Sequence, residues 1–308
     1  MQSGGIDHSA GISIGASAST ALAQPRCGVW GVLNVTDDSF SDGGMHLEPR
    51  AALAHAEKLA REGASVIDIG GASSRPAGKT YGAGAGALTP EQELARVAPV
   101  IEAVRPLGVA LSIDTMQPLV ARAALGLGAR IVNDVSCAAN RELLEVVAAA
   151  EAGYVVMHSR GKGEVAPPNT RYADVVGEVC AELLSAVERA LACGIARERI
   201  WLDPGVGFAK TAAQSLELLA KLERIVQLGY PVLVGASRKG FIAELAPHAD
   251  GRTPGPLERE AGGLAVVTAS VLKGARAVRV HDVAQARQAV MLAEALMLAE
   301  AGRGAGAC

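Results

Sequence analysis

Ten polar side chains follow short β-branched runs of the sequence, each near the point where a run ends. A strand built from Val, Ile and Leu does not need such a group for folding, although any single one could cap the helix that follows. In a barrel of parallel strands, the carboxyl ends of the strands carry the chemistry. The set therefore predicts one polar site, made by Asn34, Asp68, Asp114, Asn133, His158, Asp203, Ser237, Lys239, Arg279 and His281.

The cationic members of this set indicate an anion site. Arg279 and His281 are two residues apart, so both point to the same face of a strand, and Lys239 follows the strand before them. Arg side chains suit phosphate oxygens, and barrel phosphate sites are commonly built after strands seven and eight. Three cationic groups at one rim predict a diphosphate ligand. The alternative for Arg279 is a salt bridge that closes the barrel.

The acidic and amide members suit a flat heterocycle. A carboxylate such as Asp114 or Asp203 can accept two parallel N–H bonds, and a 2-amino-4-oxo-pyrimidine edge offers such a pair. Asn133 can add a donor and an acceptor to the same ring. Ser112 shares the strand face of Asp114. For Asp203 a second interpretation stays open, because Asp-Pro-Gly is itself a turn signal.

The segment 34–44, which follows the first strand, has a composition suited to a loop that acts at a site. It contains three Asp, two Ser and a closing Gly pair. Such a loop can move, carry an acid to the reacting centre and help to hold Mg²⁺ against a phosphate.

The elements that must position these residues alternate with one rhythm. The sequence predicts eight strands, over 28–34, 65–69, 109–113, 130–134, 153–158, 199–203, 231–235 and 276–280. It predicts eight helices, over 50–62, 90–104, 118–127, 141–151, 173–194, 212–228, 258–273 and 283–300. Strands that are almost wholly apolar indicate a parallel sheet buried on both faces. The fold class is therefore α/β, a single (β/α)₈ TIM barrel, because an open doubly wound sheet would leave more polar edge strands.

Length and composition are consistent with one such domain. The chain has 308 residues, of which 50% are hydrophobic and 20% charged, and its net charge is −3. We expect a catalytic domain over 27–301, between an N-terminal tail (1–26) and a C-terminal tail (302–308). The charge balance and the 3% of aromatic residues argue against nucleic-acid binding. No apolar run is long enough for a membrane helix, and five widely spaced cysteines favour a reducing, cytoplasmic compartment.

Eight short segments, in order along the chain, resemble the dihydropteroate synthase family. The segments are GVLNVTDDSFSDGG (31–44), DIGGASSRP (68–76), SIDT (112–115), IVNDVS (131–136), MHSRG (157–161), DPGVGFAKT (203–211), VGASRKGFI (234–242) and VRVHDV (278–283). One such segment would be weak, but all eight together are very specific.

The resemblance implies a reaction and a set of roles. The family condenses a dihydropterin diphosphate with 4-aminobenzoate, which gives dihydropteroate and diphosphate. It implies that Asp114, Asn133, Asp203 and Lys239 hold the pterin, and that Asn34, Arg279 and His281 hold the diphosphate, with Asn34 also next to Mg²⁺. It further implies that Asp42 acts from the first loop, and that the 4-aminobenzoate site involves Ser73, Ser74, Arg75, Pro76, Phe208 and Ser237. The family also suggests a homodimer.

Several positions depart from the family pattern. Asp37 replaces a Pro, Ala72 replaces a Glu, Ala209 replaces a Gly and Gly240 replaces a Ser. These changes leave the pterin and diphosphate assignments untouched. They bear on the 4-aminobenzoate site, on its loops and on sensitivity to sulfonamides.

Two alternatives to the synthase remain at this point. A methyltetrahydrofolate-type methyltransferase would share the barrel and the pterin-binding Asp and Asn residues, but it has no diphosphate to bind. Ser-Arg-Lys (237–239) and Arg-Val-His (279–281) argue against it. A non-catalytic relative that binds a pterin or a partner is the second alternative, prompted by Ala72 and Gly240.

Overall fold

The computed structural model describes residues 27–35, 49–72, 88–161, 164–235 and 237–304. Its eight parallel strands lie in the order β6-β5-β4-β3-β2-β1-β8-β7. A bridge between Leu202 and Val232 joins the two ends of this order, so the sheet closes into a barrel. The strands are β1 (Gly28–Asn34), β2 (Val66–Gly70), β3 (Ala110–Asp114), β4 (Ile131–Asp134), β5 (Gly153–Met157), β6 (Ile200–Asp203), β7 (Leu233–Val234) and β8 (Ala277–Val280).

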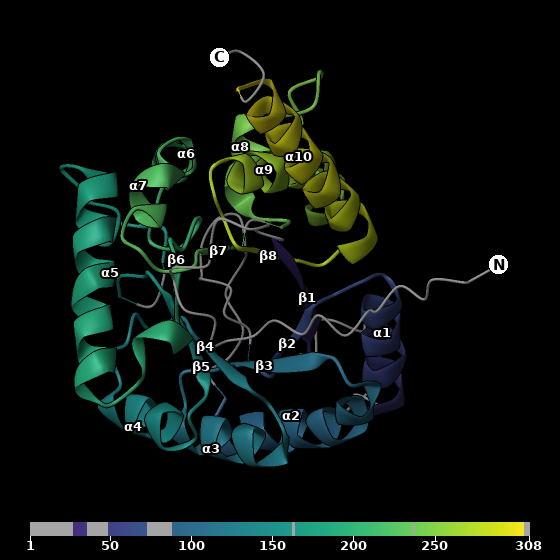
Figure 1. Ribbon diagram of the computed structural model, residues 1–308, viewed down its shortest axis with the longest axis vertical. Coiled ribbons are helices and arrows are strands. Elements are labelled where there is room, and N and C mark those ends of the chain that lie inside the picture. The colour runs from purple at the N-terminus through teal and green to yellow at the C-terminus, as the bar shows by residue number, and fades with distance from the viewer. Residues whose placement is uncertain (1–26, 36–48, 73–87, 162–163, 236, 305–308) are drawn as a thin grey trace.

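Helices form a ring outside the strands (Figure 1). They are α1 (Pro49–Arg61), α2 (Pro90–Val104), α3 (Pro118–Leu127), α4 (Arg141–Ala149), α5 (Val175–Ala192), α6 (Ala212–Ala220), α7 (Leu222–Val226), α8 (Gly240–Leu245), α9 (Glu260–Leu272) and α10 (Val283–Gly304). Three 3₁₀ turns, η3 (Arg105–Leu107), η4 (Arg197–Arg199) and η5 (Pro256–Arg259), complete the described elements. The predicted (β/α)₈ barrel is thus confirmed, and the open doubly wound sheet was the wrong alternative.

Three elements differ from the sequence prediction. The helix expected over 212–228 is two helices, because the backbone leaves helical geometry at Lys221 (φ −114°, ψ 28°). The short helix α8 was not predicted. Strand β7 has two residues instead of five, since the backbone of 231 and 232 pairs with β6 only through a single bridge.

The barrel interior has an apolar lower half. Its core consists of Trp30, Val66, Ile131, Val155, Trp201, Leu233 and Ala277. The two tryptophan rings lie 5.7 Å apart, centroid to centroid, and fill the width of the barrel. Because side chains alternate along a strand, the residues two positions further on also point inward. These positions include Asp68, Asn133, Asp203 and Arg279, so the polar site begins where the apolar plug ends.

Helix capping does not account for the predicted polar set. The side chains that cap helices are those of Thr89, Asn140, Asp174 and Thr211, at the starts of α2, α4, α5 and α6. None of these belongs to the ten strand-end residues. Within the described ranges, no helix is both long and apolar enough to cross a membrane.

Two glycines offer a matched test of the backbone. Gly205, in the turn after β6, has φ +63°, and a Cβ there would lie 1.9 Å from the carbonyl oxygen of His158. We expect Gly205→Ala to cost about 3 kcal/mol or more of unfolding free energy, through backbone clash and left-handed strain. Gly126 lies inside α3 with nothing within 4 Å of a Cβ, so Gly126→Ala should gain about 1 kcal/mol.

Urea unfolding of the two variants and the wild type measures both effects. Wild-type stability in Gly205→Ala would contradict the close approach of the turn to His158.

Candidate active site

A half-buried arginine holds two buried carboxylates together at the mouth of the barrel. The Nε of Arg279 donates to Oδ2 of Asp68, and its Nη2 donates to Oδ2 of Asp114 at 2.8 Å. The two carboxylates come from β2 and β3, and the arginine from β8. The Asp68 and Asp114 side chains are 0% and 8% exposed, so the guanidinium is the partner that makes their burial tolerable.

The charges of this cluster affect one another. Burial acts to raise the pKa of Asp114, and Arg279 opposes that rise. Burial also acts to lower the pKa of Arg279, but Asp68 and Asp114 outweigh it and raise this pKa above its ordinary value. The alternative interpretation of Arg279 as a salt bridge within the barrel therefore describes its contacts correctly. Neither of the two bonds involves its Nη1 nitrogen.

Asn133 extends the cluster, in which several buried oxygen atoms have no hydrogen-bond partner among the described residues. Its Nδ2 donates to Oδ2 of Asp68 at 3.2 Å. Three buried oxygens of this region have no hydrogen-bond partner among the described residues: Asn133 Oδ1, Asp68 Oδ1 and Ser112 Oγ. Buried polar atoms are normally paired, so such a group of acceptors points to a bound molecule with N–H donors.

Asp203 makes the turn that was one of its two interpretations from the sequence, and its second oxygen lies at the mouth of the barrel. Its Oδ1 accepts the N–H of Gly205 at 2.7 Å, which is the predicted turn. Its Oδ2 lies beside Gly235, where a Cβ would be 3.6 Å from that oxygen and 3.8 Å from the Cβ of Arg279. Asp203 and Arg279 thus converge on Gly235. Burial raises the pKa of Asp203 above its ordinary value, and Lys239 limits that rise.

Lys239 is the cation next to this group. Its Nζ donates to the carbonyl of Val206 at 2.6 Å and lies 4.4 Å from the centre of the Phe208 ring. Burial lowers the pKa of Lys239 to about 8, whereas Asp203 acts to raise it. The structure therefore brings Lys239, Asp203 and Phe208 together as the sequence predicts.

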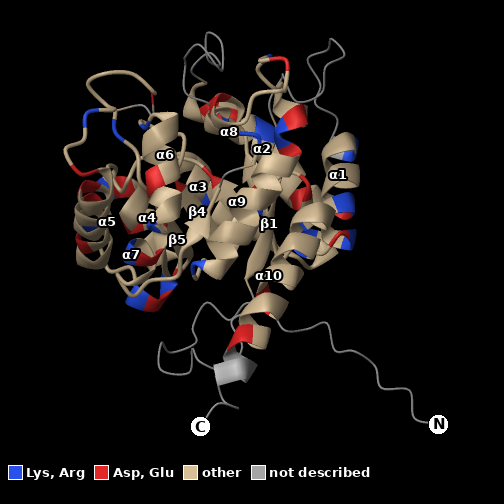
Figure 2. Cartoon of the chain, turned by 90° about the horizontal axis from the view of Figure 1, so that it is seen from above, with Lys and Arg blue, Asp and Glu red and all other residues tan. Residues whose placement is uncertain are grey.

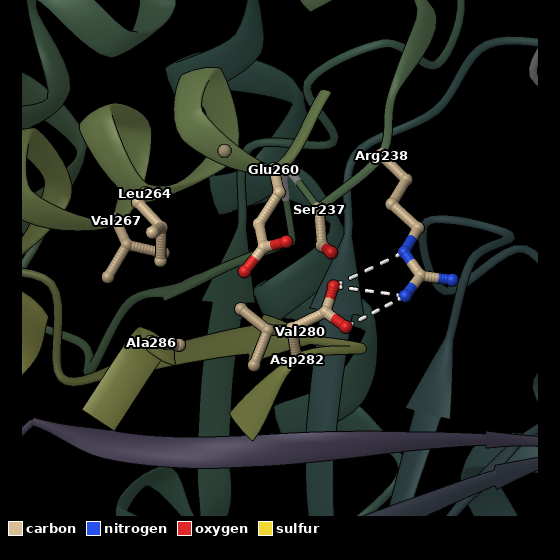
Figure 3. Close-up of a pocket in the computed structure, with 9 residues that line it drawn as sticks. Ser237, Arg238, Glu260, Leu264, Val267, Val280, Asp282 and Ala286 are labelled. Atoms are coloured by element: carbon tan, nitrogen blue, oxygen red, sulfur yellow. Dashed lines mark hydrogen bonds and ion pairs between the residues drawn. The ribbon is translucent and has the colours of Figure 1, made fainter. Parts of the chain in front are cut away.

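His281 and Ser237 form a pair at the ends of β8 and β7. The Ser237 Oγ lies 3.1 Å from Nδ1 of His281 and accepts the backbone N–H of the same residue. Arg238, between Ser237 and Lys239, turns away and binds Asp282 through both nitrogens that face it (Figure 3). Ser237, Arg238 and Asp282 border a cavity of about 20 Å³ that faces α9 and α10 rather than the barrel interior.

Asn34 lies at the mouth on β1, between β2 and β8. Its Oδ1 lies 3.7 Å from the position that a Cβ would take at Gly70, and the Cβ of Asp114 lies 3.6 Å from the same position. Asn34, Gly70 and Asp114 are aligned by strand register. In the part of the chain that the structure describes, no three His, Cys, Asp or Glu side chains form a metal-binding group.

Several predicted residues lie outside the described ranges. They are Asp42 in the first loop and Ser73, Ser74, Arg75 and Pro76 in the second, together with the departure at Asp37. Three other departures are described: Ala72 is half-buried after β2, Ala209 is buried with φ +48° in the turn after β6, and Gly240 is buried as the first residue of α8.

His158 was wrongly placed in the polar site, and its true partners were missed. In β5, Val155 belongs to the barrel interior whereas Tyr154 and Val156 face the helices, so His158 points outward as well. Its Nε2 lies 3.0 Å from Glu182 on α5, and its Nδ1 lies 2.9 Å from the Nζ of Lys210. Strand parity was the available signal for His158. Nothing in the sequence marked Glu182.

Known proteins resemble this chain along most of its length. A model of the family described as "Pterin binding enzyme" matches residues 30–281. The dihydropteroate synthase of Mycobacterium leprae is 45% identical over 259 residues, which are 83% of this chain and 88% of that protein. The chain belongs to the dihydropteroate synthase family.

Solved structures of dihydropteroate synthases share the fold. One from Xanthomonas albilineans, with 4-aminobenzoic acid, has a TM-score of 0.80 and 41% identity and covers 88% of this chain and 93% of its own. Another from this organism, in complex with 7,8-dihydropteroate, has a TM-score of 0.76 and 40% identity, with coverages of 88% and 94%. The family resemblance predicted from the eight segments is confirmed, which favours a dihydropteroate synthase over a methyltransferase.

The buried imidazole of His158 predicts a specific pH dependence of stability. Its pKa is lowered from 6.5 to about 4, first by burial and then by the charge of Lys210. The unfolded chain therefore binds the extra proton first as the pH falls. Stability is unaffected by this group above pH 6.5 and decreases below it, by about 2.5 kcal/mol between pH 7 and pH 4.5.

Urea unfolding of the wild type and His158→Gln from pH 7 to pH 4.5 measures this contribution as the difference between their slopes. The window ends at pH 4.5, the ordinary pKa of a Glu side chain, because below it the unfolded chain protonates Glu182 while the folded chain, with a pKa of about 2 there, does not, which adds a second loss of stability. The same substitution at His248, which is 35% exposed, serves as the control. Equal slopes for His158→Gln and the wild type would contradict the assignment.

Proposed function

We propose that this chain condenses (7,8-dihydropterin-6-yl)methyl diphosphate with 4-aminobenzoate to give 7,8-dihydropteroate and diphosphate. The observation that carries the proposal is the group of buried, unpaired acceptors on Asp68, Asn133 and Ser112, next to Arg279 at one barrel mouth. Such a group suits a ring edge rich in N–H donors. The family of the chain supports the same reaction.

The acidic side of the mouth would hold the pterin ring. Asp114, Asn133 and Asp203 provide acceptors and an amide, and all three are at most 8% exposed. Buried hydrogen bonds to such groups discriminate strongly against rings that lack the matching donors. Lys239 lies beside Asp203 and would complete the ring site as a donor.

The diphosphate would lie on the cationic side, against Arg279, His281 and Asn34. Two carboxylates and one guanidinium leave the Asp68–Arg279–Asp114 cluster with a formal charge of −1, so this cluster alone does not favour a diphosphate. A further cation is needed to hold the leaving group. Lys239 and His281 are the protein's own contributions.

Mg²⁺ would supply the remaining positive charge. Mg²⁺ usually keeps several waters and binds one or two protein oxygens together with substrate phosphates. Asn34 offers one neutral oxygen at the mouth, which fits an ion that arrives with the diphosphate. When bound there, the ion would stabilise the charge that develops on the leaving oxygen.

The chemistry then needs no enzyme nucleophile. The C–O bond to diphosphate breaks, its electron pair leaves with the diphosphate, and the pterin methylene becomes a carbocation. The amine of 4-aminobenzoate attacks this carbon through its lone pair, and the new C–N bond forms with loss of one N–H proton to solvent. Arg279, His281 and Lys239 stabilise the departing charge, and the buried carboxylates stabilise the cation.

The second substrate would bind outside the pterin. Phe208 and Ser237 would border 4-aminobenzoate, because Phe208 contacts Lys239 and Ser237 contacts His281. We assign Asp42, Ser73, Ser74, Arg75 and Pro76 to the loops that close over both substrates, on the strength of their matching segments. Closed loops would keep water from capturing the cation.

We also propose that the chain acts as a cytoplasmic homodimer. Four cysteines are described as free thiols, which suits a reducing compartment. Helix α9 carries almost no charge (Figure 2), and α10 packs beside it. Large apolar side chains remain exposed on α10, namely Met291, Leu292, Leu296 and Leu298. An exposed apolar patch of this kind is typical of a protein interface.

Release of diphosphate tests the reaction. The wild type should release it from the dihydropterin diphosphate only when 4-aminobenzoate is present. Lys239→Ala should lower kcat/KM by about 10²- to 10³-fold, as the loss of one group that stabilises transition-state charge usually does. Lys221→Ala, at a side chain that is 51% exposed, is the matched control.

Arg279→Ala is the less informative variant, because it leaves two buried carboxylates unpaired and destabilises the fold by about 3–5 kcal/mol. Tight binding of the pterin without any diphosphate release would favour the non-catalytic alternative. Full activity in Lys239→Ala would overturn the site assignment.

Light scattering after size exclusion tests the dimer. Leu292→Lys should yield monomers, because it places a charge in the exposed apolar patch of α10. Leu216→Lys should leave the dimer intact, since Leu216 is similarly exposed (50% against 64%) but lies on α6. A monomeric wild type, or an intact dimer in Leu292→Lys, would contradict this part of the proposal.

A further inference from the structure

Lys210 is a fully buried lysine, and the proposed function assigns it no contact with either substrate. Its side chain is 1% exposed. Its Nζ has three close partners: Nδ1 of His158 at 2.9 Å, the Phe208 carbonyl at 3.0 Å and the Gly205 carbonyl at 3.1 Å. A charged ammonium has three N–H donors, so each of these three acceptors can take one, and the His158 carbonyl lies further away, at 3.4 Å. Burial lowers the pKa of Lys210 to about 7, whereas Asp203 acts to raise it.

The acceptors of Lys210 belong to a turn that needs an external support. Within 203–210, three residues have positive φ: Gly205 (+63°), Gly207 (+78°) and Ala209 (+48°). Such a backbone does not continue a helix or a strand, so its carbonyls lack helix or sheet partners, although the Gly205 carbonyl accepts the N–H of Phe208 at 3.1 Å. Lys210 binds the carbonyls of Gly205 and Phe208, and Lys239 binds that of Val206 between them.

A chain of polar contacts fixes Lys210 from the outside of the barrel. His158 can accept from Lys210 only if its Nδ1 carries no proton, which leaves the proton on Nε2 for Glu182 at 3.0 Å. Glu182 in turn accepts from Nε of Arg160 at 3.1 Å. The Arg160 guanidinium lies 3.8 Å from the centre of the Tyr172 ring, and Tyr172 donates to the carbonyl of Ala209 at 3.2 Å.

The charges along this chain favour that arrangement. Burial and Lys210 lower the pKa of His158 to about 4, so the imidazole is neutral at physiological pH. Its hydrogen bond with Glu182 holds the pKa of that carboxyl near 2. A carboxylate next to Nε2 therefore selects the tautomer that Lys210 requires.

We propose that Lys210 is a positioning residue for the second substrate. Lys210 fixes the position of the Phe208 ring from the outer side of the barrel, and the contacts through His158 to Glu182 hold Lys210 in place. This inference rests on the proposed function, in which Phe208 borders 4-aminobenzoate. Without Lys210 the Phe208 carbonyl loses the one side chain among the described residues that binds it, whereas the Val206 carbonyl keeps Lys239. The N–H of Phe208 still donates to the Gly205 carbonyl at 3.1 Å. The affinity for 4-aminobenzoate should therefore depend on Lys210 more than the affinity for the pterin does.

The variant Lys210→Met removes the charge and the donors but keeps the length of the side chain. We expect the KM for 4-aminobenzoate to rise about tenfold, which corresponds to about 1.4 kcal/mol. The kcat and the affinity for hydroxymethyl-dihydropterin, measured by calorimetry, should stay within about twofold of the wild type. Lys221→Met is the matched control on the surface, and circular dichroism verifies that each variant is folded.

A milder pair of variants keeps the proposal testable if Lys210→Met does not fold. Glu182 and Glu178 both bind Arg160 from α5, but only Glu182 contacts His158. Glu182→Gln presents an amide that can donate to Nε2 and so favours the wrong tautomer. It should raise the KM for 4-aminobenzoate about threefold or more, whereas Glu178→Gln should leave it unchanged.

The outcomes separate this proposal from the proposed function. An inactive wild type would remove the function on which the proposal rests. With an active wild type, an unchanged KM for 4-aminobenzoate in Lys210→Met or, where that variant does not fold, in Glu182→Gln would overturn the role of Lys210. An equal loss of pterin affinity would also overturn it, because the turn would then serve both substrates as a general structural support.

Discussion

The mouth of the barrel depends on the pairing of Arg279 with Asp68 and Asp114. These residues come from three strands and are separated by 211 and 165 positions along the chain. Each buried carboxylate depends on Arg279, since an unpaired charge in this interior would cost several kcal/mol. The ion cluster and the closed barrel therefore require each other, and the Trp30–Trp201 plug below keeps the cluster at the open end.

The same mouth keeps hydrogen-bonding capacity that the fold does not use. Asp68 accepts a hydrogen bond through its Oδ2, and Asn133 donates that bond through its Nδ2. The Oδ1 atom of each residue is buried and has no hydrogen-bond partner among the described residues. Each unpaired group lowers stability by roughly 1–3 kcal/mol. Local rules of folding are commonly broken in this way at functional sites, where a ligand supplies the missing partner.

Much of this architecture could be predicted from the sequence, because strand and helix periodicities are local properties. Parity within a strand even decides the direction of a terminal side chain: Ile131 faces the barrel interior, so Asn133 does too, whereas Asp134 points outward and binds the hydroxyl of Tyr154. The prediction failed where partners come from distant segments. The pairing of Arg279 with Asp68 and Asp114 was foreseen only as a salt bridge without named partners, and the Lys210–His158–Glu182 chain joins three segments that share no pattern.

The distribution of charge explains why the proposed site needs separate groups for an N–H-rich ring and for a diphosphate. The cluster of two acids and Arg279 is net negative, which suits N–H donors and a developing cation but repels a diphosphate. Lys239, with a pKa lowered to about 8 by burial, lies where these two demands meet. It contacts the turn that holds Phe208 and also balances Asp203. The turn thus has two supports: Lys239 holds it at Val206 on the ring side of the proposed site, and Lys210 holds it at Phe208, next to the proposed place of the second substrate.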